Sequence, residues 1–456
     1  MKGTRMSLPA SDLTKQPDNR TTMELGAVLP RTAEVRDDHL FVGGVDMVEL
    51  ARTMGTALYV MDEADMRSRM EEYREAFRSR YPNSDVLYAS KAFQNKEMVR
   101  IVNDEDLCLD VSGGGELACA QAAGFPMERV FVHGNNKTPQ ELREAIEAGV
   151  HRIVVDSRIE LARVSRIAGE LGVVQPIYLR ITPGVEADTH EYIRTGCEDS
   201  KFGFTMLDDF AFRCIKDVLA APNVKLVGLH CHIGSQIFAL HSFREAVAVM
   251  VEFMARIRDE YDLIIEELDL GGGLGIAYTA DEKPSSIDDF AECTVRAVED
   301  YCAKFDVPLP RILVEPGRSL VASAGVTLYT VGILKTLPNI RKYVAVDGGM
   351  SDNVRTALYH AEYEPTIANK AGQPRTEIVT LCGKHCESGD VVVVDMPLQH
   401  PDLDDIVAVF GTGAYCYSMS SNYNGQPRPA IVFVKDGEAR VTTRRETYAD
   451  LMARDI

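Results

Sequence analysis

The sequence has no apolar run long enough to span a lipid bilayer, and no cluster of basic residues stands out in it. Lysine and arginine together number 49, against 69 aspartates and glutamates, so the formal net charge is −20. A protein of this charge is a poor ligand for nucleic acid or for an anionic membrane surface. We therefore expect neither nucleic acid nor a membrane among its partners.

A disulfide framework and a signal peptide are missing as well. The ten cysteines are scattered without framework spacing, in a chain too long to need disulfide staples. Residues 1–36 are polar and of mixed charge, without the apolar core of a signal peptide. We expect reduced thiols, a cytoplasmic location and a flexible, non-catalytic N-terminal segment over residues 1–36.

Length and composition are those of a soluble globular protein of two parts. The chain has 456 residues, of which 45% are hydrophobic and 26% charged. This is too long for one ordinary domain, and neither an internal repeat nor a low-complexity linker divides it. Two domains, or one barrel with a smaller unit, are expected.

Between residues 63 and 319, short apolar segments alternate with segments of helical periodicity. The apolar segments are Val86–Ser90, Leu107–Val111, Val130–Val132, Arg152–Asp156, Ile177–Ile181, Leu226–His230, Leu268–Leu270 and Ile312–Glu315. This α/β pattern predicts a (β/α)8 TIM barrel with the helices outside. The rival is an open doubly wound sheet, but no glycine-rich phosphate turn follows Val86–Ser90.

After residue 320 the helical pattern nearly vanishes and β-branched runs take its place. They are Val326–Val331, Tyr343–Val346, Ile378–Leu381, Val391–Val394, Ile406–Val409, Ile431–Val434 and Ala439–Thr443. They predict a second, mostly antiparallel β domain. We expect the strands before Asp62 to join it, which makes a discontinuous domain of residues 37–62 and 320–456.

Chemically reactive residues follow several of the predicted barrel strands, where barrel enzymes place their sites. Lys91 follows the first strand, and a lysine desolvated there would have a lowered pKa and could form a Schiff base with an aldehyde. The alternative is an ammonium group that reaches solvent. The glycines Gly271, Gly272 and Gly273, with Ser235 one strand earlier, predict a phosphate site, although a tight turn alone would also use such glycines.

Two further positions at the barrel mouth leave alternatives open. His230 and His232 point to one side of their strand, but no third metal ligand has suitable spacing. A ring stacked on a flat ligand, or a core histidine, fits them better, and we expect no metal. Glu315 follows an apolar strand, where it could form a structural ion pair with Arg318 or keep a heterocyclic nitrogen protonated.

Taken together, the motifs resemble those of the fold-type III pyridoxal-phosphate decarboxylases, and within them the diaminopimelate decarboxylase family. The similarity runs from about Asp38 to the C-terminus. It rests on Tyr88-Ala-Ser-Lys91-Ala, Ser200-Lys-Phe-Gly-Phe204, His230-Cys-His-Ile-Gly-Ser-Gln236, Gly271-Gly-Gly-Leu-Gly275, Glu315-Pro-Gly-Arg318, Cys386-Glu-Ser-Gly-Asp390 and Gly413-Ala-Tyr415.

The resemblance implies pyridoxal 5′-phosphate as cofactor and a role for each matching residue. Lys91 would hold the cofactor, His232 would stack on its ring and Glu315 would pair with its pyridine nitrogen. The phosphate and its surroundings would be contacted by residues of the late barrel loops and of the C-terminal domain: Ser235, Gly271, Gly272, Gly273, Gly317, Arg318 and Tyr415. A carboxylate at the pyridine nitrogen strengthens the electron sink, which favours decarboxylation.

The implied substrate is an amino acid with a second carboxylate, meso-2,6-diaminopimelate, which would lose carbon dioxide to give L-lysine at the end of lysine biosynthesis. Its distal end would meet Arg318, Arg355, Tyr359, Glu387 and Tyr415. Cys386 would enter the site from the second subunit of a homodimer and donate a proton to the product, unless it is an inert thiol or forms a disulfide with Cys382.

One departure from the family pattern lies beside this region, because Thr356 stands where the family usually has proline. The segment that begins at His360 differs slightly as well. Decarboxylation of a basic amino acid (ornithine, arginine or lysine) is therefore the alternative activity. A regulatory binding protein that kept the fold and lost the chemistry is the alternative of another class.

Overall fold

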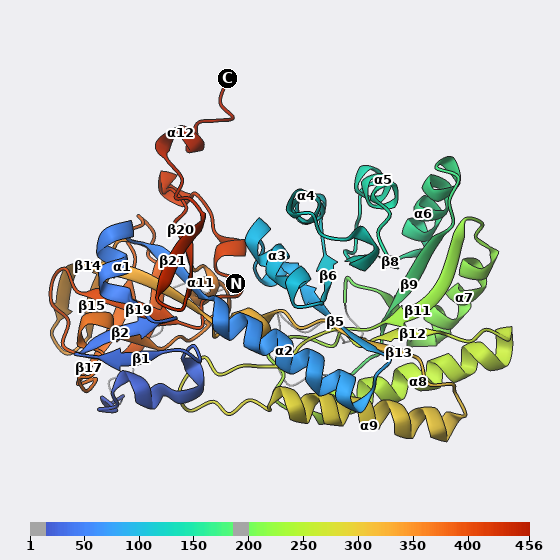
Figure 1. Cartoon of the computed structure of the whole chain (residues 1–456), viewed down its shortest axis with the longest axis horizontal. Helices are drawn as coiled ribbons and strands as arrows, with labels where there is room; N and C mark the ends of the chain where they lie inside the picture. Colours follow the sequence, from blue (N-terminus) through green and yellow to red (C-terminus); the bar gives the residue numbers. More distant parts are fainter. Residues whose placement is uncertain (1–14, 186–199) are drawn as a thin grey trace, which may run out of the picture. The chain divides into compact units, whose positions relative to one another are not determined.

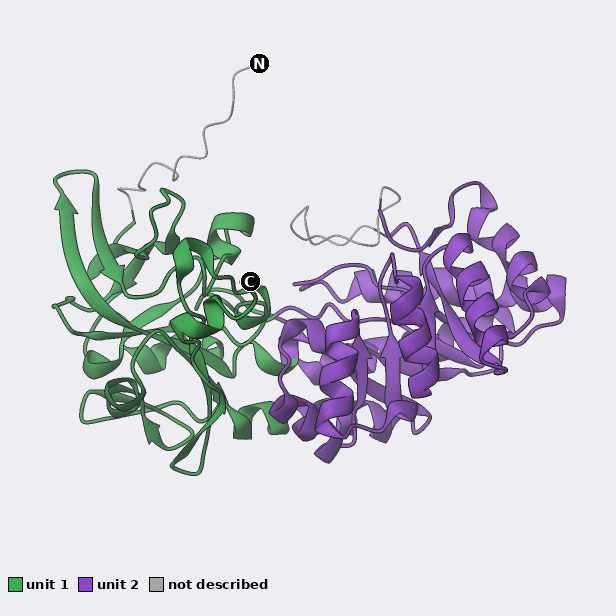
Figure 2. Ribbon diagram, turned by 90° about the horizontal axis from the view of Figure 1, so that it is seen from above, with its two compact units in different colours: residues 1–68, 276–283, 320–456 green, residues 69–275, 284–319 purple. Residues whose placement is uncertain are grey.

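The computed structural model describes residues 15–185 and 200–456, which fall into two compact units, green and purple in Figure 2. The green unit, here the β unit, comprises the described residues up to Ser68 together with Ile276–Lys283 and Leu320–Ile456. The purple unit, here the barrel unit, comprises the described residues of Arg69–Gly275 and Pro284–Ser319. Residues 1–14 of the expected N-terminal segment lie outside the described residues.

The barrel unit confirms the predicted closed barrel. In the described part of the chain, eight parallel strands follow one another in the order β9-β11-β12-β13-β5-β6-β7-β8, and β8 pairs with β9 to close the ring. Their bounds are β5 (Ser84–Ala89), β6 (Cys108–Val111), β7 (Val130–Val132), β8 (Arg152–Val155), β9 (Gln175–Thr182), β11 (Val224–His230), β12 (Glu267–Asp269) and β13 (Arg311–Val314). The two-residue strand β10 (Phe204–Thr205) pairs with the end of β9.

Helices lie outside these strands (Figure 1), as a barrel of nearly continuous apolar strands requires. They are α3 (Lys96–Asp104), α4 (Gly114–Ala123), α5 (Pro139–Ala148), α6 (Arg158–Glu170), α7 (Phe210–Ala220), α8 (His241–Tyr261) and α9 (Ile287–Phe305). Several begin at a side chain that caps the free amides of the first turn, such as Thr138 before α5 and Ser286 before α9. The helix α2 (Glu63–Arg80) runs from the β unit into the barrel unit.

Side chains on the inner face of the barrel form three layers, because alternate residues of a strand point the same way. On β13 and the residue after it, the inward positions are Arg311, Leu313 and Glu315. The middle layer is apolar or aromatic and takes one buried residue from most strands: Leu87, Cys108, Phe131, Val154, Tyr178, Val227 and Leu313. Charged layers therefore lie at both ends of an apolar middle layer.

The β unit contains the expected, mostly antiparallel sheet. Its strands run in the order β18-β17-β15-β14-β4-β20-β21, and β19 joins β14 and β16. The bounds are β4 (Leu58–Asp62), β14 (Gly325–Leu337), β15 (Arg341–Val346), β16 (Pro365–Ile367), β17 (Glu377–Cys382), β18 (Val391–Leu398), β19 (Ile406–Phe410), β20 (Ala430–Lys435) and β21 (Glu438–Thr443). The early strand β4 lies between β14, to which it is antiparallel, and β20, to which it is parallel.

The residues before β4 are more ordered than their polar composition predicted. Thr22–Val28 form the 3₁₀ helix η1, and Leu25 and Val28 are buried in the core of the β unit. The buried Arg375 pairs with Asp18 and Glu364, which fixes residues just before η1. A three-stranded sheet follows, of β1 (Glu34–Arg36), β2 (His39–Val42) and β3 (Val45–Asp46), and then α1 (Met47–Met54). Two apolar anchors and one ion-pair cluster thus order a segment whose other residues are polar.

Two further observations bear on the expectations from composition. None of the helices in residues 15–185 and 200–456 is long and apolar enough to cross a membrane. Cys382 and Cys386 are separate thiols, so the disulfide weighed for them is not formed.

Candidate functional site

Polar side chains collect inside the barrel at the carboxyl ends of its strands. They are Asp110 of β6, His133 directly after β7, Arg180 of β9, His230 of β11, Asp269 of β12 and Glu315 directly after β13. All six are buried, with at most 8% of each residue exposed. Burial of so many ionisable groups in one place is costly unless they are paired or serve a ligand.

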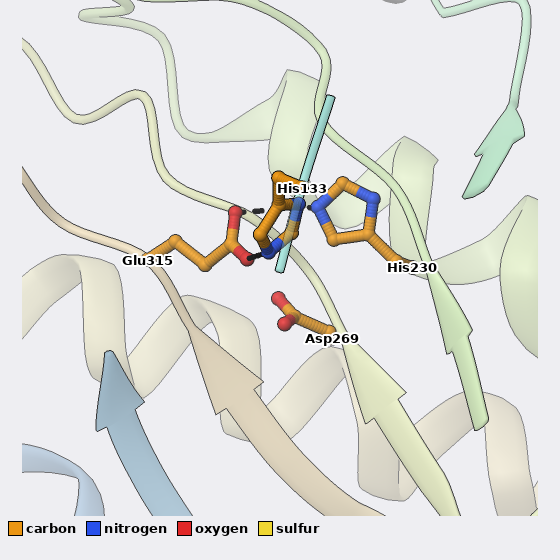
Figure 3. Close-up of side chains that lie close together, drawn as sticks. All are labelled: His133, His230, Asp269 and Glu315. Carbon is orange, nitrogen blue, oxygen red and sulfur yellow. Dashed lines mark hydrogen bonds and ion pairs between the residues drawn. The ribbon is translucent and has the colours of Figure 1, made fainter. Parts of the chain in front are cut away.

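Glu315 contacts both histidines of this group (Figure 3). Its Oε1 lies 2.7 Å from Nε2 of His133, and its Oε2 lies 3.2 Å from Nε2 of His230. The carboxyl group of Asp269 faces the same point from β12. The ion pair with Arg318 that the sequence left open is therefore not formed, because the partners of Glu315 are two imidazoles.

The surroundings shift the pKa values of the three carboxyl groups of this site in different directions. Burial alone would raise the pKa of Glu315, but His133 and His230 hold it well below its usual value. Burial and the charge of Glu315 raise the pKa of Asp269 well above its usual range, and burial also raises the pKa of Asp110. The site thus keeps one ionised carboxylate, Glu315, beside two carboxyl groups that favour their protonated form.

Several buried polar atoms of the site have no hydrogen-bond partner among the described residues. They are both carboxyl oxygens of Asp110, Oδ2 of Asp269 and Nδ1 of His230. Native proteins rarely leave such atoms unsatisfied, so a cluster of them points to a missing polar partner. An ionised carboxylate at the bottom of such a cluster suits a cationic N–H donor, and a protonated pyridine nitrogen is one.

Lys91 lies at the same rim of the barrel, but it is not buried. It follows β5 in a short 3₁₀ turn, Ser90–Ala92, and its side chain is exposed. The expected burial of Lys91 is therefore not found in the protein alone, because the buried strand β5 ends two residues before it. Its positive charge acts on Asp110, Glu116 and His232, so it lies close to the buried polar groups at this end of the barrel.

His232 and the glycine-rich turn after β12 contact each other. The amide of Gly272 donates to Nδ1 of His232 at 3.3 Å, and burial together with Lys91 keeps the pKa of His232 well below its usual value. The amide of Gly271 donates to Oδ1 of Asp269 at 2.9 Å. Two of the three amides expected to bind phosphate thus already have acceptors, so that expectation rests on Gly273.

This turn requires glycine for steric reasons too. A Cβ atom on Gly272 would lie 2.1 Å from the carbonyl oxygen of Glu315, and one on Gly273 would lie 2.5 Å from that of Gly234. The loops after β11, β12 and β13 therefore pack backbone against backbone. Gly317 has a similar role, because its Cβ would lie 3.1 Å from those of Ala89 and Ala92. The loop of Glu315 is thereby packed against the loop of Lys91.

Ser235 and Arg318 meet on this rim. The guanidinium of Arg318 donates to Oγ of Ser235 from Nε at 3.2 Å and from Nη2 at 2.9 Å. Arg318 is buried, with 6% of the residue exposed. A hydroxyl and a guanidinium side by side on late barrel loops are suited to an anion such as phosphate.

The other predicted site residues lie in the β unit. Arg355 and Tyr359 begin and end the helix α11 (Arg355–Tyr359), and the guanidinium of Arg355 lies 6.0 Å from the ring of Tyr415. Cys386 and Glu387 are exposed on the loop between β17 and β18, where the amide of Cys386 donates to Asn424 at 2.8 Å. The structure thus brings Arg355 and Tyr415 together and places Cys386 and Glu387 on a loop of their own.

The departure at Thr356 has a structural explanation. Its hydroxyl donates to the carbonyl oxygen of Val392 at 2.7 Å and to that of Ala361 at 3.1 Å. These bonds tie α11 to β18 and fix the chain that leaves the helix. His360 ends α11 in a left-handed conformation, with φ of 53°.

Sequence reasoning missed His133 and gave no role to Asp110, Asp269 or Arg180. The signal that singled out Glu315, a polar residue at the end of a buried strand, is also present at His133, which directly follows Val130–Val132. The strand is only three residues long, which makes the sequence signal at His133 weak. Asp269 lies within an apolar segment, Leu268–Leu270, so the sequence pattern does not mark it as the end of a strand.

Geometry alone leaves two kinds of ligand for this cluster of buried polar groups. One ligand atom from each of His133, His230, Asp269 and Glu315 can be chosen so that all lie within 4.8 Å of one another, which would also suit a metal ion. His232, the other histidine weighed for a metal, is not part of this group. Comparison with known proteins separates the two possibilities.

A family model described as "Pyridoxal-dependent decarboxylase, pyridoxal binding domain" matches residues 63–322. A diaminopimelate decarboxylase of Bacillus subtilis is 48% identical over 418 residues, 92% of this chain and 95% of that protein. One from Mycobacterium tuberculosis is 43% identical over 451 residues, 96% of this chain and 97% of that protein. The crystal structure of the M. jannaschii diaminopimelate decarboxylase with L-lysine superposes with a TM-score of 0.88 at 36% identity, covering 94% of this chain and 98% of that one.

Proposed function

The chain belongs to the diaminopimelate decarboxylase family of pyridoxal-dependent decarboxylases, and from this we propose that it converts meso-2,6-diaminopimelate to L-lysine and carbon dioxide. The carboxylate lost is the one at the D-centre, and the reaction is the last step of lysine biosynthesis. The cofactor is pyridoxal 5′-phosphate, which supplies an electron sink for the carbanion left when carbon dioxide departs.

The observation that carries this proposal is the state of Glu315. It is a buried carboxylate kept ionised by His133 and His230, at the same end of the barrel as Lys91. A carboxylate in this state favours the protonated pyridine nitrogen, which makes the ring a stronger electron sink. A binding protein that had lost the chemistry would have no need of an ionised carboxylate in an apolar barrel.

The remaining residues of the barrel unit would bind and orient the cofactor. The amine of Lys91 would hold its aldehyde carbon, and the uncharged ring of His232 would stack on its face. Ser235, Arg318 and the amide of Gly273 would take the phosphate. Tyr415 of the β unit would add a hydroxyl to the same phosphate, as the family resemblance implies.

The substrate would be recognised by charge at its distal end. We propose that Arg318, Arg355 and Tyr359 bind the carboxylate that is kept, and that Glu387 binds the distal amine. Cys386 would donate the proton that replaces the carboxylate. Ornithine, arginine and lysine each lack a second carboxylate, so the two arginines favour diaminopimelate.

A substrate panel tests the proposal. The purified enzyme, loaded with pyridoxal 5′-phosphate, is given meso-2,6-diaminopimelate, ornithine, arginine and lysine in turn, and release of carbon dioxide is measured. We expect turnover of diaminopimelate only. Faster turnover of one of the other three would replace the proposed substrate, and no turnover of any would indicate a binding protein.

We also propose a cytoplasmic homodimer in which Cys386 serves the site of the partner subunit. The test mixes a Lys91→Ala protein with a Cys386→Ala protein and measures activity in verified mixed dimers. Recovery of activity is expected, because one of the two sites then has both intact residues. Absence of recovery would mean that each site is built from one chain.

A further inference from the structure

Arg355 is a buried cation whose described neighbours offer it no negative charge. Only 7% of the residue is exposed. Among residues 15–185 and 200–456, it has no carboxylate within ion-pair distance. Its hydrogen-bond partners are instead two phenols: Nη1 donates to the hydroxyl of Tyr363 at 2.6 Å and to that of Tyr278 at 3.1 Å.

The other two buried arginines of the β unit are neutralised. Arg375 is fully buried and pairs with Glu364 at 2.5 Å and with Asp18. Arg341 pairs with both oxygens of Asp395 at 3.0 Å. In the β unit, the buried arginines with a structural role are thus paired with carboxylates. Arg355 differs from them because its partners are phenols.

The rings of the two tyrosines hold the guanidinium in place as well. Its carbon lies 5.1 Å from the ring centre of Tyr278 and 5.8 Å from that of Tyr363, within the range of cation–π attraction. The two rings meet edge to face at 5.3 Å. Tyr278 packs against Gly411, where a Cβ atom would lie 3.0 Å from the ring. The orientation of the guanidinium is thus fixed from two sides.

Phenols orient a guanidinium without cancelling its charge. Burial raises the pKa of Tyr363 well above its usual value despite the nearby Arg355, so its hydroxyl stays neutral at physiological pH. A carboxylate in the same place would form an internal ion pair, and an incoming anion would then have to compete with it. A buried, oriented and uncompensated cation is a receptor for an anion.

We propose that Tyr278 and Tyr363 are positioning residues that hold Arg355 as an uncompensated receptor for the distal carboxylate, and so set the preference for amino acids with a second carboxylate. The inference rests on the proposed function and adds residues that the family motifs do not include. It follows that removing either hydroxyl weakens binding of the distal carboxylate and leaves the reacting end of the substrate unchanged.

The test uses two competitive inhibitors that differ only in that carboxylate. L-Lysine keeps the carboxylate that is distal in the substrate, and 1,5-diaminopentane lacks it. Inhibition constants for both are measured against meso-2,6-diaminopimelate turnover in the holoenzyme, for the wild type, Tyr278→Phe and Tyr363→Phe. Tyr329→Phe is the matched control, because Tyr329 is also fully buried in the β unit but makes none of these contacts.

We expect Tyr363→Phe to weaken inhibition by lysine about tenfold, which corresponds to the loss of one hydrogen bond to a charged group. Inhibition by diaminopentane and kcat should stay the same, while KM for diaminopimelate rises with the lysine constant. Tyr278→Phe should act in the same direction with a smaller change, because its bond is longer. The Tyr329→Phe control should leave all four quantities unchanged.

Equal weakening of both inhibitors would show that the tyrosines only support the fold, and unchanged constants would show that they do not position Arg355; either result overturns the inference. A wild-type enzyme that prefers ornithine, or binds lysine no more tightly than diaminopentane, would overturn the substrate itself before any variant is made. A Tyr363→Glu variant sharpens the test, since it supplies the missing carboxylate and should abolish the preference for lysine.

Discussion

Both ends of the barrel interior contain buried carboxyl groups, but these groups have many hydrogen-bond partners at one end and few at the other. Glu267 and Asp269 are two residues apart on β12 and point into the barrel. At the amino end, Glu267 accepts from Arg152 at 2.9 and 3.0 Å, from Arg311 at 3.1 Å and from the hydroxyl of Tyr178 at 2.6 Å. At the carboxyl end, Asp269 has one backbone amide as donor and a carboxylate as neighbour.

The pKa values of Glu267 and Asp269 reflect this difference in hydrogen-bond partners. Burial works against ionisation at both, but hydrogen bonds from Arg152 and Tyr178 lower the pKa of Glu267 to about 2. Burial and Glu315 raise the pKa of Asp269 well above its usual range. A buried charge therefore does not by itself indicate a functional site. What separates the two layers is whether the buried polar atoms have partners within the protein.

If this comparison is right, Glu315→Gln should abolish most of the activity and still give a folded protein. The variant removes the only carboxylate kept ionised for the pyridine nitrogen, so kcat should fall by about 10²-fold or more. Because the pKa of Glu315 is lowered in the folded protein, the loss of its charge should also cost some stability at neutral pH, but the main effect should be on kcat. Carbon dioxide release and unfolding followed by circular dichroism measure the two effects. Retained activity would mean that Glu315 is structural.

The reverse is expected at the other end of the same strand. Glu267→Gln leaves two buried arginines, Arg152 and Arg311, without their shared carboxylate, which should lower the free energy of unfolding by about 3–5 kcal/mol. The folded fraction should keep its kcat. Urea unfolding should be followed by far-ultraviolet circular dichroism, since the chain has no tryptophan. A loss of stability smaller than about 1 kcal/mol would remove the distinction between the layers.

The difference in stability between wild type and Glu267→Gln should depend on pH. The pKa of Glu267 is lowered from 4.5 to about 2 in the folded protein, so its contribution to stability is present above pH 4.5 and is lost as the pH falls towards 2. The wild-type advantage over the variant should therefore shrink across this window. The difference between their unfolding midpoints at a series of pH values measures it, and a constant difference would contradict the assignment.

The smallest effect is expected at Asp269→Asn. Asparagine resembles the protonated carboxyl group that the site favours, so the free energy of unfolding at neutral pH should change by about 1 kcal/mol or less. The sign with pH is opposite to that of Glu267: a raised pKa means that wild-type stability declines as the pH rises through it. The variant should thus gain on the wild type towards alkaline pH in the same unfolding assay.

Much of the barrel could be predicted because its strands are short, apolar and regularly spaced. The predicted Val130–Val132 coincides with β7, and Arg152–Asp156 differs from β8 by one residue. Residues such as Lys91 and Glu315 stand out because strand ends are visible in the sequence. The sequence does not show whether a charged residue at a strand end is buried, because the exposure of Lys91 depends on the turn that follows β5.

Partners from distant parts of the chain could not be predicted by periodicity. Arg355 meets Tyr278 across 77 residues, and His230 meets Glu315 across 85. A local pattern reports which face of a strand a residue occupies, but not which other element supplies its counter-charge. The family motifs located Arg355, whereas only the fold shows that phenols rather than carboxylates surround it.

The position of β4 has a consequence for how the protein is made. This strand is translated early, yet its two neighbours are β14 and β20, and the second of these lies close to the C-terminus. On the ribosome, an apolar segment at residues 58–62 must therefore wait unpaired while the whole barrel emerges. Truncation of the last thirty or so residues would remove β20 and leave one edge of β4 unpaired, although β14 and the barrel strands would be complete.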